Sequence, residues 1–313
     1  MENHTAVEYF RLLLFSNNPV DKWWTFSVFF LIYCLGVIIN MTIITATCLE
    51  RFLHTPLYLF LSNLSFVDIC YTTVIIPKLL DMILSGNFTM SSMQCFTQLF
   101  FFITVAGIEE ILLFIMAIDR YVAICNPLHY HQILSWKNCT LITVCAWVLS
   151  FLNSLLFTKS AAHMSFCGSN IIQQFFCDAK AMTKIACGDN YLFYAVLGIE
   201  FLFFGLVPFI CSLASYIKII RVILKIKSAE GRKKAFSTCS SHLTVLSMYY
   251  GTASSVYLKP SSDNSLTLEQ VFTILYTTIT PMLNPLVYSI RNKDIKASLK
   301  KLIGTNYFFL KRF

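Results

Sequence analysis

The chain has 313 residues, of which 57% are hydrophobic and only 13% charged, about half the charged share of an average soluble domain. A soluble protein of this length needs a polar shell that would interrupt its apolar stretches, yet the stretches here reach membrane-spanning length. The formal charge of +8 does not indicate nucleic-acid binding, because the basic residues are confined to short segments between apolar stretches. The composition therefore favours an all-α integral membrane protein.

Seven apolar stretches come close to the roughly 20 residues that a helix needs to cross a bilayer. They cover residues 24–49, 57–80, 96–119, 140–158, 192–220, 236–258 and 266–290. No internal repeat or long linker divides the chain, so we expect one seven-helix domain over residues 1–313. Residues 1–23 lack a signal-peptide pattern, and the first span is expected to direct insertion.

The distribution of Lys and Arg predicts the orientation. The segments after the first, third, fifth and seventh spans hold 17 of the 24 basic residues, so the positive-inside rule places them in the cytoplasm and residues 1–23 outside. The sequons that begin at Asn3 and Asn87 would then face the outside, where glycosylation is expected. The chain is predicted to be a multi-pass protein of the plasma membrane.

The cytoplasmic tail, residues 291–313, begins with an amphipathic pattern. Ile295, Leu299 and Leu302 recur at helical spacing, with Lys296 and Lys300 between them. This pattern predicts a short helix on the inner leaflet, with its lysines toward anionic lipid headgroups.

Four cysteines fall on the predicted outer side. Cys95 starts the third span, and Cys167, Cys177 and Cys187 lie in the loop between the fourth and fifth spans. On an oxidising face these thiols are expected to form disulfides. Four cysteines allow three pairings, and the spacing alone does not choose between them.

Five segments, in chain order, resemble the odorant-receptor branch of the rhodopsin-like G-protein-coupled receptors. They are Leu53-His54-Thr55-Pro56-Leu57-Tyr58, Met116-Ala117-Ile118-Asp119-Arg120-Tyr121, Ser215-Tyr216, Lys234-Ala235-Phe236-Ser237-Thr238-Cys239-Ser240-Ser241-His242-Leu243 and Pro281-Met282-Leu283-Asn284-Pro285. Leu57 and Ile118 replace the usual Met and Tyr of that family. Tyr249-Tyr250-Gly251 stands where other rhodopsin-like receptors have a Trp and a Pro, which argues against an amine or peptide receptor.

The resemblance implies a receptor that binds a small volatile odorant within the helix bundle. It also implies activation of a stimulatory, olfactory-type heterotrimeric G protein, a rise in cyclic AMP, and residence in the cilia of olfactory sensory neurons. Neither a nucleophile–base pair nor a metal constellation suggests an enzyme, and no cofactor is expected apart from a candidate ion. Two alternatives remain open: a rhodopsin-like receptor that acts outside olfaction, and a transporter or channel, although inverted repeats are not found.

Carboxylates inside a membrane are costly and therefore indicate function. Asp68 and Glu109 match acidic positions of the family, and Asn40 and Asn284 are expected beside them. We interpret this set as a sodium site of the resting state. A protonated carboxyl that is hydrogen-bonded between helices is the alternative interpretation.

The resemblance also implies the activation machinery. Arg120 would be held by Asp119 at rest and released when the sixth span swings outward, although a purely structural ion pair is an alternative. Tyr216 and Tyr288 would then supply hydroxyls to the open form. The full predicted set for activation and coupling is Asp119, Arg120, Tyr121, Tyr216, Asn284, Pro285 and Tyr288.

Helix phase predicts the ligand pocket. The candidate lining residues share a similar depth in the third, fifth, sixth and seventh spans and are mostly apolar, as small-molecule sites usually are. They are Phe102, Ile103, Ala106, Gly107, Phe201, Phe204, Ser254, Tyr257, Ile274 and Thr277. Helix packing explains each of them equally well. For the outer cysteines, the family pattern implies that Cys95 pairs with Cys177 and Cys167 with Cys187.

Overall fold

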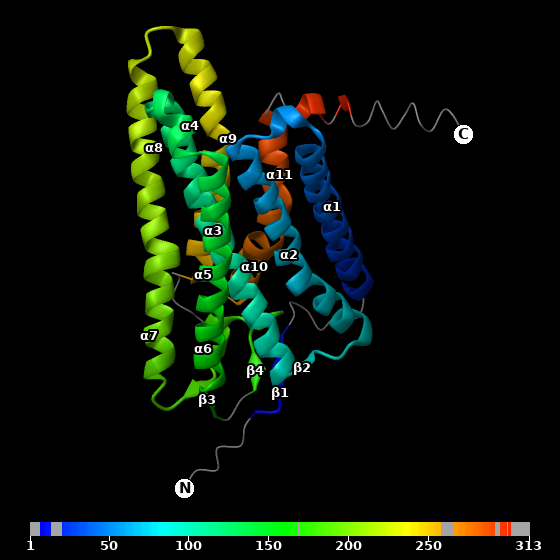
Figure 1. Ribbon diagram of the computed structural model, residues 1–313. Coiled ribbons are helices and arrows are strands. Elements are labelled where there is room, and N and C mark those ends of the chain that lie inside the picture. The colour runs from blue at the N-terminus through cyan, green and yellow to red at the C-terminus, as the bar shows by residue number, and fades with distance from the viewer. Residues whose placement is uncertain are drawn as a thin grey trace, which may run out of the picture.

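The computed structural model describes residues 7–13, 21–167, 170–257, 266–291, 295–298 and 300–301. Long helices run side by side along one axis of the molecule (Figure 1). In chain order they are α1 (Asp21–Leu49), α2 (Pro56–Ser85), α3 (Ser92–Cys125), α5 (Trp136–Ala162), α7 (Tyr191–Glu200), η3 (Phe201–Leu206), α8 (Val207–Lys225), α9 (Ala229–Tyr257), α10 (Leu266–Ile274), η5 (Leu275–Ile279) and α11 (Thr280–Arg291).

Within these described residues, five helical segments are long and apolar enough to cross a bilayer: Lys22–Leu49, Pro56–Ser85, Ser92–Cys125, Trp136–Ala162 and Tyr191–Lys225. The sixth predicted span corresponds to α9. This helix begins before the predicted span, because the prediction counted only the apolar stretch and left out the first turns, which carry Arg232 and Lys233. The seventh is formed by α10, η5 and α11 in succession.

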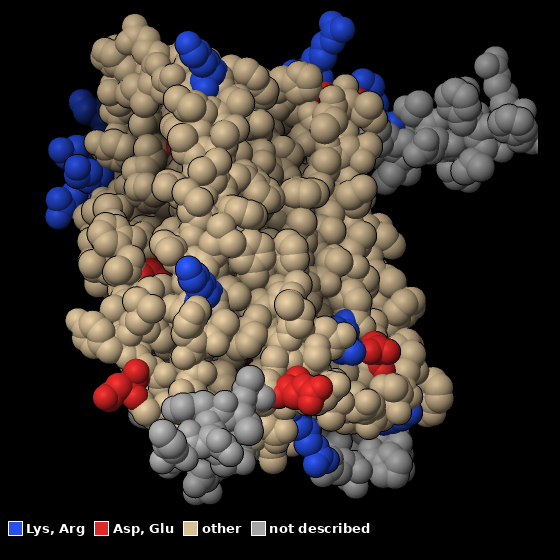
Figure 2. All heavy atoms as spheres, turned by 60° about the horizontal axis from the view of Figure 1, so that its bottom comes forward, with Lys and Arg blue, Asp and Glu red and all other residues tan. Residues whose placement is uncertain are grey.

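The surface of the bundle is apolar along its length. On α1, Leu31, Leu35 and Ile38 are each more than half exposed, and large exposed apolar surfaces of this kind are not stable in water. Figure 2 shows a wide area without charged side chains, with blue and red atoms gathered mainly toward its edges. The protein is therefore built to lie in a membrane.

One end of the bundle, here called the strand end, carries short strands that the sequence did not predict (Figure 1). β1 (Tyr9–Leu12) pairs antiparallel with β2 (Thr89–Ser91) and parallel with β4 (Ile171–Ile172), and β3 (Ser165–Phe166) pairs antiparallel with β5 (Ala186–Cys187). The loop after α5 also contains a short helix, α6 (Ala179–Thr183). These elements fold that loop into a cover over the bundle.

The opposite end, here called the basic end, carries the turn between α8 and α9, where basic residues gather. It also holds the short elements η1 (Arg51–Leu53), η2 (Pro127–His129) and α4 (Tyr130–Ile133). The described part of the predicted tail helix is helical at residues 295–298 and 300–301, and Lys301 forms an ion pair with Glu50.

Local sequence signals explain where several helices begin and end. At the start of α3, the Ser91 hydroxyl accepts from the Gln94 backbone N–H while the Gln94 side chain accepts from the Ser91 N–H, which satisfies amides that the first helical turn leaves free. At the end of α2, Gly86 adopts a φ of 71°, a left-handed conformation that glycine accepts without steric cost.

Two turns of π-helix interrupt the fifth and seventh spans. η3 ends just before Pro208 and η5 just before Pro281. A proline lacks the N–H for the i−4 hydrogen bond and its ring clashes with that carbonyl, so the preceding turn widens. The helices of these two spans therefore adapt to the prolines by forming π turns.

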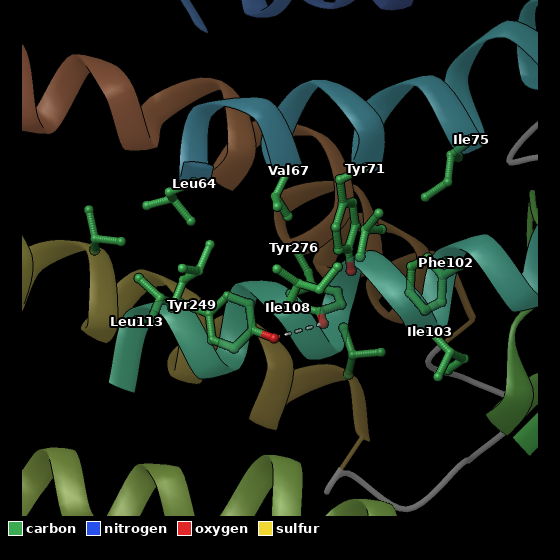
Figure 3. Packing of buried hydrophobic residues seen from close by; sticks show 14 of the residues in the cluster. Leu64, Val67, Tyr71, Ile75, Phe102, Ile103, Ile108, Leu113, Tyr249 and Tyr276 are labelled. Atoms are coloured by element: carbon green, nitrogen blue, oxygen red, sulfur yellow. Dashed lines mark hydrogen bonds between the residues drawn. The ribbon is translucent and has the colours of Figure 1, made fainter. Parts of the chain in front are cut away.

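The core lies between α2, α3, α9 and η5. Val67 of α2 lies above Ile108 of α3, and Ile75 of α2 points toward Phe102 of α3, within one cluster of buried hydrophobic residues (Figure 3). Tyr249 of α9 and Tyr276 of η5 join the same cluster, with their hydroxyls 3.4 Å apart. The polar and aromatic groups described next are embedded in this packed centre.

Candidate functional site

A polar centre joins three spans in the middle of the bundle. Asn284 Nδ2 donates to Asp68 Oδ1 at 3.1 Å and to Glu109 Oε1 at 3.3 Å. All three residues are 1% exposed. The structure thus brings Asp68, Glu109 and Asn284 together as the sequence predicted.

The polar centre also contains oxygens that could coordinate a cation. Asn284 Oδ1 is buried without a hydrogen-bond partner among the described residues, and so is the hydroxyl of Ser65, three positions before Asp68 in α2. Hard cations prefer oxygen ligands, so two carboxylates beside an unpartnered amide oxygen fit a sodium ion. Asn40 Nδ2 donates to the carbonyl oxygens of Gly36 and Pro281, so this side chain links α1 to α11. Its Oδ1 is likewise buried without a hydrogen-bond partner among the described residues.

At the basic end, a buried ion pair ends α3. Arg120 Nε donates to Asp119 Oδ2 at 2.8 Å, and its Nη2 makes a second hydrogen bond to the same oxygen. The Tyr130 hydroxyl of α4 donates to the other carboxylate oxygen, Asp119 Oδ1, at 2.7 Å. Asp119 therefore holds Arg120 on one side and the loop helix on the other.

Next to this pair, three rings link spans five, six and seven. The Tyr216 hydroxyl lies 2.7 Å from His242 Nδ1. The His242 and Tyr288 rings are stacked at 6.4 Å, and the Tyr288 hydroxyl is buried without a partner among the described residues. His242 was not predicted as a site residue, although it stands in the segment that resembles the family's sixth span.

The other predicted activation residues have different surroundings. The Tyr121 ring lies 5.5 Å from Lys218 Nζ, on the outer side of the ion pair. Pro285 lies inside α11, next to Asn284. Both belong to the half of the bundle that faces the basic end.

Toward the strand end, aromatic rings fill the interior. Phe102 packs against Tyr71 at 5.3 Å and against Phe176 of the covering loop at 4.9 Å. Tyr276 contacts Tyr71, at 5.9 Å, and Tyr257, at 6.0 Å; Tyr257 lies at the edge of the set and is 38% exposed. Figure 3 shows Tyr71, Phe102 and Tyr276 converging from α2, α3 and η5. We call these five residues the aromatic chamber.

Several predicted pocket residues adjoin this chamber. Ile103 and Thr277 are buried, while Ala106 and Ile274 are half-buried against the core. Phe102 and Tyr257 are chamber members. The sequence missed Tyr71, Phe176 and Tyr276, whose aromatic side chains gave no positional signal.

Gly107 lies at a close approach of three helices. A Cβ atom there would lie 3.1 Å from Ser150 Oγ of α5 and 3.3 Å from a ring carbon of Phe204 in η3. The glycine therefore lets the phenyl ring pack against the α3 backbone. Gly107 and Phe204 are in contact, which agrees with helix packing as well as with a shared pocket.

Two of the predicted pocket residues lie elsewhere. Phe201 is 51% exposed, so the prediction that it faces inward is wrong. Ser254 is exposed and lines a groove of about 360 Å³ between α8 and α9 that opens on the bundle surface. The Phe201 prediction assumed an undistorted α-helix, whereas η3 changes the phase of the fifth span. Ser254 lies in α9, an uninterrupted α-helix, so there the predicted inward face itself was wrong.

The cover is fixed to the bundle by covalent and polar contacts. Disulfides join Cys95 to Cys177 and Cys167 to Cys187, which confirms the pairing implied by the resemblance. Gln98 of α3 accepts from the Cys177 N–H at 2.9 Å. The covering loop is thus held directly over the aromatic chamber.

A buried carboxyl in the cover binds the sixth span. Asp178 Oδ2 accepts from the Ala181 N–H at 3.0 Å, and Oδ1 accepts from the Tyr257 hydroxyl at 3.2 Å. Burial raises the pKa of Asp178, and these hydrogen bonds oppose the rise. Nearby, Lys180 and Lys184 form ion pairs with Glu269 of α10 at 3.2 and 3.4 Å.

Of the predicted glycosylation sites, Asn87 is exposed at the strand end, where its side chain accepts from Thr89. Asn3 lies outside the described residues.

The geometry defines a membrane receptor bundle, in which an aromatic chamber beneath a disulfide-bound cover is connected through a polar centre to a buried ion pair at the basic end. The family model for olfactory receptors matches residues 26–306. Olfactory receptor 1L1 of Homo sapiens is 46% identical over 301 residues, which cover 96% of this chain and 83% of that protein. Olfactory receptor 1 of Rattus norvegicus is 43% identical over 300 residues, 96% of each chain. The chain belongs to the olfactory receptor family, whose members are odorant receptors rather than enzymes.

Proposed function

We propose that this odorant receptor binds its ligand at the aromatic chamber and activates a stimulatory, olfactory-type G protein, which raises cyclic AMP. The observation that carries this proposal is the position of Arg120 in a buried ion pair with Asp119, next to rings from three other spans. A buried charge is stable only while it is paired. An outward movement of α9 would separate Tyr216 from His242 and give a partner protein access to Arg120.

The ligand proposal follows from the chemistry of the chamber. Its lining is aromatic, with tyrosine hydroxyls from α2, α9 and η5, so it suits a small apolar molecule with one or two hydrogen-bonding groups. Because rings fill the space, binding requires side chains such as Phe102 to change rotamer. The cover, which carries Phe176 and is tied to Tyr257 by Asp178, would transmit that change to α9.

The polar centre is proposed to hold a sodium ion in the resting state. Asp68, Glu109 and the Asn284 side-chain oxygen would coordinate it, and the ion would supply the positive charge that keeps two carboxylates ionised side by side. The alternative, in which one carboxyl is protonated and shares the Asn284 amide, uses the same contacts. The two differ in their response to sodium concentration.

The proposed orientation places the strand end outside the cell and the basic end in the cytoplasm. The excess of Lys and Arg at the basic end supports it. The lysines beside Ile295 would meet anionic lipid of the inner leaflet. By family, the plasma membrane of olfactory cilia is the proposed location.

The decisive test measures cyclic AMP and transmembrane current in the same receptor-expressing cells across a chemically diverse odorant panel. The cells used lack the downstream cyclic-nucleotide pathway. In these cells we expect at least one odorant to raise cyclic AMP and to leave the transmembrane current unchanged. An odorant-evoked current without cyclic AMP would favour the channel alternative and contradict the proposal. A non-odorant ligand as the only agonist would favour a receptor that acts outside olfaction.

A further inference from the structure

We infer that the groove between α8 and α9 is a binding site for a bilayer-dissolved aliphatic molecule that carries one hydroxyl or carbonyl oxygen. The groove has a volume of about 360 Å³, at the lower end of the range of small-molecule pockets. It lies apart from the aromatic chamber, on the outer surface of the bundle. Phe209 and Leu213 of α8 and Leu246 of α9 form its apolar walls.

Two contacts cross this groove. The Phe209 and Tyr250 rings meet edge to face at 4.9 Å. Toward the basic end, Tyr216 lines the groove and is hydrogen-bonded to His242. On the strand-end side of the ring pair the groove continues along Gly251, which has no heavy atom within 4 Å of the position that a Cβ would take.

The polar groups of the groove point to the chemistry of its ligand. Ser212 and Tyr250 line it, and their hydroxyl oxygens are buried yet have no hydrogen-bond partner among the described residues; Ser212 as a whole is only 2% exposed. Buried polar groups without a partner are rare and costly. A ligand oxygen placed between the helices would satisfy them, whereas a plain lipid acyl chain would not.

The depth of the groove identifies the source of that ligand. Ser212 precedes Ile220, the last residue of the predicted fifth span, by 8 positions, which corresponds to about 12 Å along a helix. The hydrocarbon core of a bilayer is about 30 Å thick. The opening therefore faces hydrocarbon, and the occupant must reach it through the membrane.

Photolabelling of the receptor in lipid nanodiscs tests this site. The probe is a dodecanol that carries a diazirine, and its control is the matching dodecane without the hydroxyl. We expect dodecanol to label peptides that contain residues 209–216 and 243–254 in preference to other lipid-facing peptides. Ser212→Ala and Tyr250→Phe should each weaken this labelling, by about fivefold for one lost hydrogen bond, and leave dodecane labelling unchanged.

A matched pair of glycine variants tests occupancy. Gly251→Leu fills the groove and should abolish the preferential labelling, whereas Gly198→Leu, at an equally open helical position of α7 outside the groove, should not. Uniform labelling of all lipid-facing helices, labelling of the aromatic chamber alone, or equal labelling of the Gly251→Leu variant would overturn the inference.

The consequence for signalling rests on the proposed function. An occupant would separate α8 from α9 beside the Tyr216–His242 contact, so dodecanol should shift the odorant dose–response curve of the wild type and of Gly198→Leu but not of Gly251→Leu. If dodecanol labels the groove but no odorant raises cyclic AMP, the binding site is supported and the proposed function is refuted. A shift that persists in Gly251→Leu would contradict the groove as its origin.

Discussion

The side-chain amide of Asn284 donates to Asp68 Oδ1 at 3.1 Å, a contact between residues 216 positions apart in the sequence. The same amide donates to Glu109, so one side chain bridges two carboxylates that would otherwise repel each other. This centre ties α2, α3 and α11 together between the two ends of the bundle.

Removal of either carboxylate should therefore remove sodium sensitivity. We expect sodium to lower the ligand-independent activity of the wild type, and Asp68→Asn and Glu109→Gln to abolish this effect. Glu200→Gln is the matched control, because Glu200 is another intramembrane carboxylate but lies on α7. Nucleotide exchange by the G protein, measured across sodium concentrations in receptor membranes, provides the readout. If the two variants respond to sodium as the wild type does, the ion is bound elsewhere.

Asp178 predicts a pH-dependent stability. Because burial raises its pKa in the folded state, its contribution is fully present below the unfolded value of about 3.9 and is lost as pH rises through the folded pKa. Relative to Asp178→Asn, the wild type should gain thermal stability as the pH falls through that window. Parallel melting curves of the two purified proteins measure the difference, and a constant offset at all pH values would refute the raised pKa.

The disulfide between Cys95 and Cys177 should be essential for the cover. Loss of this disulfide is expected to lower the stability of the folded protein by about 2–4 kcal/mol and to free the loop from the first turn of α3. Cys95→Ser and Cys177→Ser should show the same loss of surface delivery and signalling, and the double variant should be no worse than either. A double variant with a clearly additive defect would show that the two cysteines act separately.

Gly107→Leu should suppress the response to most ligands. The new side chain would meet Ser150 and Phe204, whose atoms already lie 3.1 and 3.3 Å from the Cβ position. Overpacking of this kind costs about 1–3 kcal/mol, and Gly107→Ala should have a smaller effect. Dose–response curves at matched surface levels measure both. An unchanged ligand profile for the leucine variant would place the ligand away from this helix crossing.

The sequence was sufficient for the parts of the structure that depend on composition and on family motifs. Apolar length predicted the long helices, and the motifs predicted the contacts of Asn284 and the pairing of Cys95 with Cys177. Each of these predictions depends on which residue type stands at a given depth in the membrane. Small errors in helix phase do not change them.

Helix phase itself was the weak point. Phe201 and Phe204 would share a face in an α-helix, but η3 separates them, so that Phe204 contacts Gly107 and Phe201 is exposed. The cover was also beyond prediction, because the strands and the Asp178 contact to Tyr257 depend on how a long loop folds onto distant spans.

The most direct test of the receptor account is nucleotide exchange by a purified stimulatory G protein on receptor nanodiscs, with the wild type compared to Arg120→Ala. The ligand is an odorant identified from the cyclic AMP panel, and its binding is measured on the same samples. We expect the odorant to accelerate exchange on the wild type, and the variant to bind the odorant without accelerating exchange. Equal acceleration by both proteins, or none by the wild type, would contradict the role of Arg120 and the coupling of the aromatic chamber to the basic end.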